Sequence, residues 1–379
     1  MIYMDNAATS WPKPDCVYNG VTNCMKKYAA NPGRSGHGMS LQAARIILYA
    51  REMLCKLFNV NDPFRMIFTA NATESLNLAI KGILKPGDHV ITTRMEHNSV
   101  IRPIVELQKQ AITSTFINAD RKGGIDPQDI KKAINARTKL IVTTHASNVT
   151  GTILPAQDIG KIAHDHGITY LLDAAQTAGS IPMDFSALGI DLAAIPGHKS
   201  LLGPQGTGIL YIAPGIDLKQ LKEGGTGSNS ESLTQPEFCP DKFESGTLNT
   251  PGIAGLAVAI RYILYETQSK LNAHVKKLET HFLGEISNLP EITVYGHIGQ
   301  HLRAGAISIN IRDRDSSEIA EILDTEHKIA VRGGLHCAPL AHLSIGTQRQ
   351  GTVRFSFGIF NTIDEIDTCI GALKRIVRD

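Results

Sequence analysis

The sequence predicts an α/β protein in which a large, mostly parallel sheet is flanked by helices and followed by a smaller α+β domain. Between about residues 60 and 215, short β-rich runs alternate with helical patterns, an order typical of parallel strands joined by crossover helices. Residues 214–252 are then rich in Gly, Ser, Thr and Pro, and a different rhythm follows. At 379 residues, the chain is also longer than one average domain.

Five strands and four helices are expected in the first part of the chain. The strands cover residues 65–68, 89–93, 139–144, 169–172 and 192–195, and the helices lie near 73–83, 98–110, 127–135 and 156–166. Ligands of such sheets bind beyond the carboxyl ends of the strands. The residues that directly follow each run are therefore the first candidates for a site.

The C-terminal part has its own pattern. We expect a long helix over about 251–283, a half-buried strand over 307–311, a helix capped by Asp315 with Glu318, a strand over 352–357 and a final helix that opens with the capping box Thr362-x-x-Glu365. The expected division is a large domain over residues 1–255 and a small domain over 256–379. Residues 1–15 are expected to pack with the small domain.

Composition excludes several classes of protein. Lys plus Arg number 38 and Asp plus Glu 36, which gives a formal charge of +2. This balance gives no reason to expect a basic surface that would bind nucleic acid or a membrane. The start of the sequence lacks the pattern of a signal peptide, and we expect a cytoplasmic protein. The six cysteines form no C-x-x-C pair and no H-E-x-x-H occurs, so neither a disulfide framework nor a metal site is expected.

An acid and a lysine stand at the ends of two expected strands. Asp173 follows the run 169–172, and Lys199 follows the run 192–195. If these strands are parallel neighbours, both side chains reach one crevice. A lysine that bonds covalently to an aldehyde, with an acid that keeps a pyridine nitrogen protonated, suits pyridoxal 5'-phosphate (PLP). The alternative is an unrelated surface acid and surface lysine.

Two further features favour the PLP interpretation. Asn71 is a candidate N-cap, and it would leave the N–H groups of Ala72 and Thr73, with the Thr73 hydroxyl, as a cradle for a phosphate. His97 follows the run 89–93 and so stands at the same edge of the sheet. Each feature alone would be an ordinary capped helix or a structural histidine.

Nine motifs in order resemble the cysteine desulfurases and selenocysteine lyases of the class V aminotransferase group, over nearly the whole chain. They are Asp5-Asn6-Ala7-Ala8-Thr9, Ala72-Thr73-Glu74-Ser75-Leu76-Asn77, Glu96-His97-Asn98-Ser99, Ser147-Asn148-Val149-Thr150-Gly151, Asp173-Ala174-Ala175-Gln176, Gly197-His198-Lys199, Phe243-Glu244-Ser245-Gly246-Thr247, Arg332-Gly333-Gly334-Leu335-His336-Cys337 and Val353-Arg354-Phe355-Ser356. The resemblance implies the fold type I aminotransferase fold, with a seven-stranded sheet in the PLP-binding domain.

The resemblance also implies how PLP would be held. Its residues would be Lys199 as the covalent attachment, Asp173 at the ring nitrogen, Gln176 at the phenolic oxygen, His97 stacked on the ring, and Ala72, Thr73 and His198 at the phosphate. Thr247 matches a threonine that completes the phosphate site of the partner subunit, which implies a homodimer. Pro196 stands where these relatives usually carry a phosphate-binding Ser or Thr; a water or the Gly197 N–H could replace that contact.

For the substrate, the resemblance implies binding by Asn148, Arg332 and Arg354, with Arg354 gripping the carboxylate. Cys337, in a loop that Gly333 and Gly334 predict to be mobile, would attack the sulfur of the substrate as a thiolate, favoured by Arg332 or His336. The catalytic residues would then be Cys337, Lys199 and His97. The short segment between Arg332 and Arg354 is similar to the branch with a short cysteine loop.

The implied activity is a PLP-dependent cysteine desulfurase. It would convert L-cysteine to L-alanine and pass sulfur, as a persulfide on Cys337, to an acceptor protein. The alternatives are a selenocysteine lyase acting on L-selenocysteine, an aminotransferase or other PLP enzyme on the same scaffold, and a non-catalytic PLP-binding scaffold.

Overall fold

The central sheet of the computed structural model, which describes residues 1–33, 36–298 and 303–378, has seven strands. Their order is β2 (Met66–Thr69), β8 (Gly208–Ile212), β7 (Leu192–Pro196), β6 (Thr169–Asp173), β5 (Thr138–Thr144), β3 (His89–Thr93) and β4 (Thr113–Ile117). Pairing is parallel from β7 to β4, and only β8 runs against its neighbours β7 and β2. The predicted mostly parallel sheet is confirmed, although the prediction missed β4 and β8.

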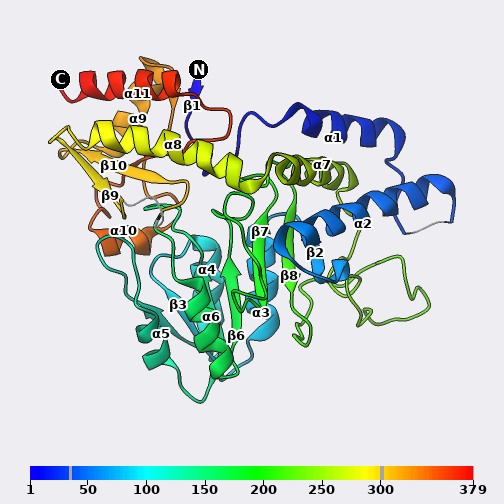
Figure 1. Ribbon diagram of the computed structural model, residues 1–379. Coiled ribbons are helices and arrows are strands. Elements are labelled where there is room, and N and C mark those ends of the chain that lie inside the picture. The colour runs from blue at the N-terminus through cyan, green and yellow to red at the C-terminus, as the bar shows by residue number, and fades with distance from the viewer. Residues whose placement is uncertain (34–35, 299–302, 379) are drawn as a thin grey trace.

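Helices cover both faces of this sheet (Figure 1). They are α3 (Ala72–Ile83), α4 (Asn98–Gln108), α5 (Pro127–Ala133) and α6 (Ala156–Asp165). Side chains alternate between the faces along each strand. Val142 and Leu171 join a core with α3 and α4, whereas Ile141 and Leu172 join the core that contains α6.

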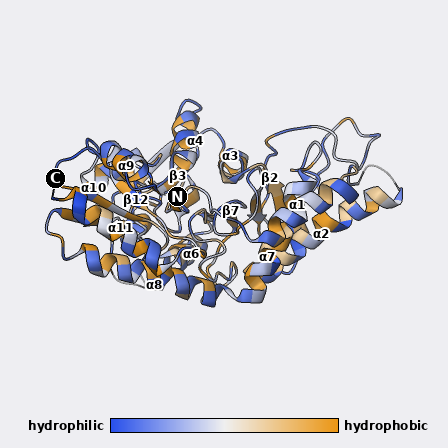
Figure 2. Ribbon diagram, turned by 90° about the horizontal axis from the view of Figure 1, so that it is seen from above, coloured by the Kyte–Doolittle hydropathy of each residue, from blue (hydrophilic) through white to orange (hydrophobic). Residues whose placement is uncertain are grey.

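Three helices form a layer at one end of the molecule (Figure 2). They are α1 (Asp15–Lys27), α2 (Gly38–Phe58) and α7 (Thr250–Glu266), and both α1 and α2 pack along α7. A single 3-10 turn, η1 (Pro63–Arg65), links α2 to the sheet. Between β8 and α7 the described chain has no helix or strand, as predicted for residues 214–252.

The C-terminal elements form a second layer with its own core (Figure 1). They are α8 (Gln268–Ile286), β9 (Ile292–Tyr295), β10 (Ile307–Ile311), α9 (Ser316–Thr325), β11 (Ile329–Ala330), α10 (Pro339–Ile345), β12 (Val353–Phe355) and α11 (Ile363–Ile376). Strands β12, β10 and β9 pair antiparallel. The predicted cap of α9 by Asp315 and the capping box of α11 are both present.

The long helix predicted over 251–283 is wrong, because the chain breaks at Thr267 into α7 and α8. Thr267 has a left-handed φ of 65°, and its side chain accepts a hydrogen bond from Lys270 N to cap α8. Helix α7 packs in the core of the large sheet, and α8 packs in the C-terminal core. The two cores therefore meet at this break.

The N-terminal segment, residues 1–10, links the two cores. Strand β1 (Ile2–Tyr3) pairs parallel with β11, and Met4 is buried in the C-terminal core. Further along, the Ser10 hydroxyl donates to Lys199 O at 2.9 Å. The segment therefore runs from the C-terminal core directly to the loop that carries the candidate lysine.

Candidate active site

A cavity of about 240 Å³ lies at the carboxyl edge of the central sheet. Its walls come from strand ends, the N-termini of α3 and α4, the N-terminal segment and the C-terminal elements. The predicted site residues that line it are Ala72, Thr73, His97, Asn148, Asp173, Gln176, His198, Lys199, Arg332 and Arg354. The structure thus brings together residues that are up to 282 positions apart, 354 against 72, in one place.

Asp173 is the last residue of β6, and Lys199 follows the adjacent parallel strand β7. Asp173 is 3% exposed and accepts a hydrogen bond from Ala175 N at 2.9 Å. Burial raises the pKa of the Asp173 carboxyl, and Lys199 opposes that rise. Burial, the largest influence, lowers the pKa of Lys199 to about 8. An amine with such a pKa is ready to lose its proton near neutral pH.

The turn that presents Lys199 depends on a glycine. A Cβ at Gly197 would lie 2.1 Å from Thr207 Oγ1, so no larger residue fits between β7 and Thr207. Gly197 N donates to Thr207 O at 2.9 Å. This N–H is therefore engaged and cannot take over the phosphate contact that Pro196 lacks. The expectation that it could do so is wrong.

The N-terminus of α3 forms one end of the cavity. Asn71 caps the helix by accepting from Glu74 N at 2.9 Å, as predicted. The N–H groups of Ala72 and Thr73 precede the first helical hydrogen bond, which is made by Ser75 N. Thr73 Oγ1 lies 2.8 Å from Ser99 Oγ. These donors at the positive end of the helix dipole suit a phosphate.

His97 is held as a neutral ring at the cavity wall. It caps α4, and its Nδ1 accepts from Ser99 N at 3.1 Å. Burial lowers the pKa of His97 to about 4, with Lys199 adding to the effect. Because Nδ1 accepts, the single proton of the neutral ring is on Nε2. His198 also lines the cavity; burial lowers its pKa to about 4 as well, and its Nδ1 lies 3.1 Å from Thr9 Oγ1.

Arg354 supplies a buried cation from β12. Its Nη2 donates to Asp5 Oδ1 at 2.7 Å, and its Nη1 donates to Asn148 O at 3.1 Å. Arg332, which forms a backbone bridge with Arg354, lines the same wall. Two guanidinium groups therefore face one end of the cavity, where they can bind a carboxylate.

Cys337 lies beside this cationic end and is exposed. Arg332 Nη2 is 3.4 Å from Cys337 Sγ. His336 points away from the sulfur: it is 2% exposed, its Nε2 lies 2.9 Å from Thr352 Oγ1, and burial lowers its pKa to about 2. Of the two residues expected to favour the thiolate, the geometry therefore supports Arg332 and not His336.

The backbone of the cysteine loop is hydrogen-bonded to residues that follow strands β3 and β5 of the central sheet. His336 and Cys337 both have left-handed φ values, 48° and 59°, which are strained for residues with a side chain. Asn148 Nδ2 donates to His336 O at 2.7 Å, and Asn98 N donates to Cys337 O at 2.8 Å. These bonds hold the strained conformation that presents Cys337.

Thr247 does not line the cavity of its own chain. It belongs to the long segment before α7, where Asn31 Nδ2 donates to its hydroxyl at 3.4 Å. Thr247 is exposed on this segment.

The sequence patterns indicated no role for Glu96 or Asp5, although both residues belong to motifs that carry the family resemblance. Glu96 is fully buried; its Oε1 accepts from Thr93 Oγ1 at 2.6 Å and from Thr144 N at 3.0 Å, so it joins the ends of β3 and β5. Burial raises its pKa to about 8. The contact with Thr144 joins residues 48 positions apart, and no local sequence pattern could reveal it.

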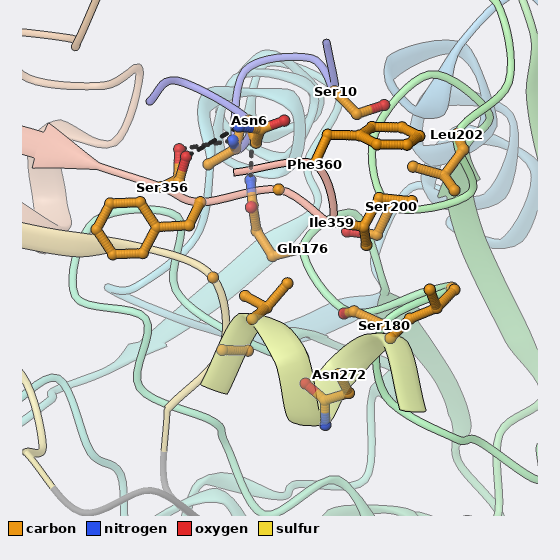
Figure 3. A pocket seen from close by; sticks show the side chains of 18 of the residues that line it. Asn6, Ser10, Gln176, Ser180, Ser200, Leu202, Asn272, Ser356, Ile359 and Phe360 are labelled. Carbon is orange, nitrogen blue, oxygen red and sulfur yellow. Dashed lines mark hydrogen bonds between the residues drawn. The ribbon is translucent and has the colours of Figure 1, made fainter. Parts of the chain in front are cut away.

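A second, smaller cavity of about 80 Å³ lies between the N-terminal segment and α8 (Figure 3). The two cavities share Ala7 and Gln176 as wall residues. Gln176 Nε2 donates to Ala7 O at 3.3 Å, and Figure 3 shows Gln176 reaching toward the N-terminal segment, opposite Asn272 of α8. Gln176 therefore separates the main cavity from the cleft between the two cores.

The main cavity fits PLP. It combines free helix N–H donors for a phosphate, a buried carboxyl for a pyridine nitrogen, a neutral flat ring and a lysine with a lowered pKa. In the described parts of the chain, no group of three or more His, Cys, Asp or Glu is placed to hold a metal ion. No helix there is long and apolar enough to cross a membrane.

The chain belongs to the class-V aminotransferase family, whose profile matches residues 2–369. Within that family it is similar to cysteine desulfurases. A protein of Methanothermobacter thermautotrophicus named "Probable cysteine desulfurase" is 36% identical, over 99% of this chain and 94% of the relative. A cysteine desulfurase of Salmonella agona is 30% identical, over 100% and 94%. The apo structure of the cysteine desulfurase from Thermococcus onnurineus NA1 has a TM-score of 0.93 and 33% identity, covering 100% of this chain and 94% of that one.

Proposed function

We propose that this protein is a PLP-dependent cysteine desulfurase that converts L-cysteine to L-alanine and carries the sulfur on Cys337. The observation that supports this most strongly is the exposed Cys337 thiol beside Arg332, at the mouth of a cavity that also contains Lys199 and Asp173. An aminotransferase or a non-catalytic PLP-binding protein would need no nucleophile there. Similarity to cysteine desulfurases over the whole chain supports the same proposal.

PLP, when bound, would supply an electron sink for the bonds at the Cα of an amino acid. Around it, Asp173 would face the ring nitrogen, His97 the ring and Gln176 the phenolic oxygen, while Ala72, Thr73 and His198 would hold the phosphate. Lys199 Nζ, with its pKa near 8, can exchange a proton with the substrate near neutral pH. Arg354 and Asn148 would bind the substrate carboxylate.

The sulfur transfer involves Cys337 directly. Its thiolate attacks the sulfur of the substrate, so the new S–S bond forms as the C–S bond breaks, and the carbon that loses sulfur gains a proton. The balanced result is L-cysteine plus Cys337–SH giving L-alanine plus Cys337–S–SH. Arg332, 3.4 Å from the sulfur, favours the negative charge that this attack needs.

Mass spectrometry after exposure to L-cysteine tests the proposal. A sulfur adduct on Cys337, together with alanine release and with sulfide when a reductant is added, is the expected result. Full activity of Cys337→Ala would contradict the persulfide step. Pyruvate-dependent amino transfer without sulfide would instead indicate an aminotransferase, and bound PLP whose absorbance L-cysteine leaves unchanged would indicate a non-catalytic scaffold.

A selenocysteine lyase is the second candidate. Only a short segment separates Arg332 from Arg354, which is similar to the branch of the family that includes such lyases. Comparing kcat/KM for L-selenocysteine and L-cysteine, in the wild type and in Cys337→Ala, distinguishes the two. A lyase keeps its activity on selenocysteine without Cys337, because selenium leaves more readily.

We also propose a cytoplasmic homodimer that delivers sulfur to an acceptor protein. Thr247, outside its own cavity, would complete the phosphate site of the partner subunit. All six cysteines are free thiols, which supports a reducing compartment. Sedimentation shows the oligomeric state, and Thr247→Ala is expected to weaken PLP binding. A monomer with full PLP affinity would contradict the shared site.

A further inference from the structure

The guanidinium of Arg354 is only partly used by the protein. It is 1% exposed and has five N–H groups. Nη2 donates to Asp5 Oδ1 and Nη1 donates to Asn148 O. Among the described residues Nε has no partner although it is buried. A buried donor without a partner is costly in free energy, so this group is suited to a ligand in the cavity that Arg354 lines.

Asp5 approaches the same guanidinium without lining that cavity. Its side chain is 18% exposed, and only one of its oxygens bonds to only one nitrogen of Arg354. The contact therefore supplies a counter-charge while leaving the other N–H groups available. A carboxylate in the cavity can bind Arg354 without displacing Asp5.

The backbone fixes where Asp5 stands. On its two sides, Ser356 N donates to Met4 O at 2.8 Å and Asn6 N donates to Ser356 O at 3.2 Å. Tyr3 Oη also donates to Asp5 O at 3.0 Å. Asp5 is thus paired with Ser356, two residues after Arg354, so the acid and the guanidinium keep one relative position.

We propose that Asp5 is a positioning residue for substrate recognition, which holds Arg354 so that its remaining N–H groups bind the α-carboxylate of the amino acid. The proposal rests on the proposed function, because that function makes an amino acid the ligand of the cavity. It adds a residue from the N-terminal segment to the determinants of substrate binding.

Two variants separate this role from the opposite one. If Asp5 competed with the substrate for Arg354, removing its charge would tighten carboxylate binding in both Asp5→Asn and Asp5→Ala. If Asp5 orients Arg354, Asp5→Asn, which keeps an oxygen acceptor in the same place, should stay within about threefold of the wild type, whereas Asp5→Ala should weaken binding about tenfold.

The experiment measures the binding of L-alanine and of L-alaninamide to the PLP-loaded protein by titration calorimetry. Alaninamide lacks the carboxylate charge, so its affinity includes the other contacts of the ligand but not the ion pair with Arg354. We expect Asp5→Ala to lose about tenfold in affinity for L-alanine and less than about twofold for alaninamide. Asp165→Ala, which removes an exposed carboxylate on α6, is the matched control and should change neither.

Three results would overturn the proposal. They are L-alanine binding more than about threefold tighter in Asp5→Asn or Asp5→Ala, unchanged L-alanine binding by Asp5→Ala, and an equal loss for both ligands. If Asp5→Ala does not fold, Asp5→Asn still decides between orientation and competition. Steady-state desulfuration should show the same change, as a higher KM with kcat within about twofold. Failure of the proposed function would appear differently, as no alanine or sulfide formed from L-cysteine by the wild type.

Discussion

Arg51 of α2 and Glu244 form a buried ion pair, with 2.5 Å between Nη2 and Oε2 and side chains 3% and 6% exposed. Phe68 N donates to the other oxygen of Glu244 at 2.6 Å, and the guanidinium of Arg51 lies over the Phe68 ring, 4.7 Å from its centre. Glu244 is three residues before Thr247. The pair therefore anchors the segment that carries Thr247 to α2 and β2.

Removing one partner of this pair should be costly. We expect Glu244→Leu to lower the free energy of unfolding by about 3–5 kcal/mol, because the buried Arg51 charge loses its counter-ion. The double variant Arg51→Met with Glu244→Leu should recover most of that loss, since no buried charge remains. Urea unfolding measures both. A double variant no more stable than Glu244→Leu would contradict this account.

Glu96 should make stability depend on pH. In the unfolded chain its carboxyl loses a proton near its ordinary pKa of 4.5, but in the folded protein burial raises the pKa to about 8. Between these pH values Glu96 keeps its proton in the folded state and has lost it in the unfolded state. The contribution of Glu96 to the free energy of unfolding therefore falls as pH rises from about 4.5 to 8 and then levels off. The isosteric variant Glu96→Gln should lack this fall.

The difference in urea midpoint between Glu96→Gln and the wild type tests this expectation. It should grow in favour of Glu96→Gln from pH 5 to pH 8, while the exposed control Asp165→Asn shows no such trend. A difference that does not vary with pH would mean that Glu96 is ionised throughout the range.

Cys337 should be required for sulfur transfer but not for the cofactor. We expect Cys337→Ser to reduce alanine formation from L-cysteine by at least about 100-fold, because the hydroxyl is a poor acceptor of sulfur. PLP absorbance should not change, since Cys337 does not line the cavity. Cys16→Ser, at a half-buried thiol of α1, is the control and should keep activity. Equal losses in both variants would argue against a special role for Cys337.

Arg332 should control the reactivity of Cys337. Its Nη2 donates a hydrogen bond to Sγ at 3.4 Å, so Arg332→Met, which removes this charged donor from the attacking sulfur, is expected to slow alkylation of Cys337 by iodoacetamide about five- to tenfold at pH 7.5. Arg332→Lys should give an intermediate rate. Equal rates at pH 7.5 would show that Arg332 does not act on the sulfur.

Local patterns predicted those features that depend on neighbouring residues. The N-cap Asn71, the capping box of α11 and the parallel strands that end at Asp173 and before Lys199 follow from short stretches of sequence. Strand β4 was missed because it is a half-exposed edge strand, and β8 because it follows a glycine-rich turn and runs antiparallel. The break at Thr267 depends on one left-handed residue within a continuous helical pattern.

Long-range contacts could not be predicted in the same way. The resemblance indicated which residues gather at the cavity, but it did not indicate that Asp5 pairs with Arg354 or that His336 turns toward Thr352. These contacts depend on packing between segments that are distant in the chain. A residue type and its immediate neighbours carry no information about them.

The N-terminal segment also constrains the order in which the protein can assemble. Asp5 and Arg354 are separated by 349 positions, and β1 pairs with β11 near the other end of the chain. During synthesis, residues 2–6 must wait until almost the whole chain has left the ribosome before they find their partners at residues 328–330 and 354–356. Closing so long a loop is entropically unfavourable and slow. The substrate-binding end of the cavity is therefore expected to be the last part to form, so a chain cut short in translation would not display an active cavity.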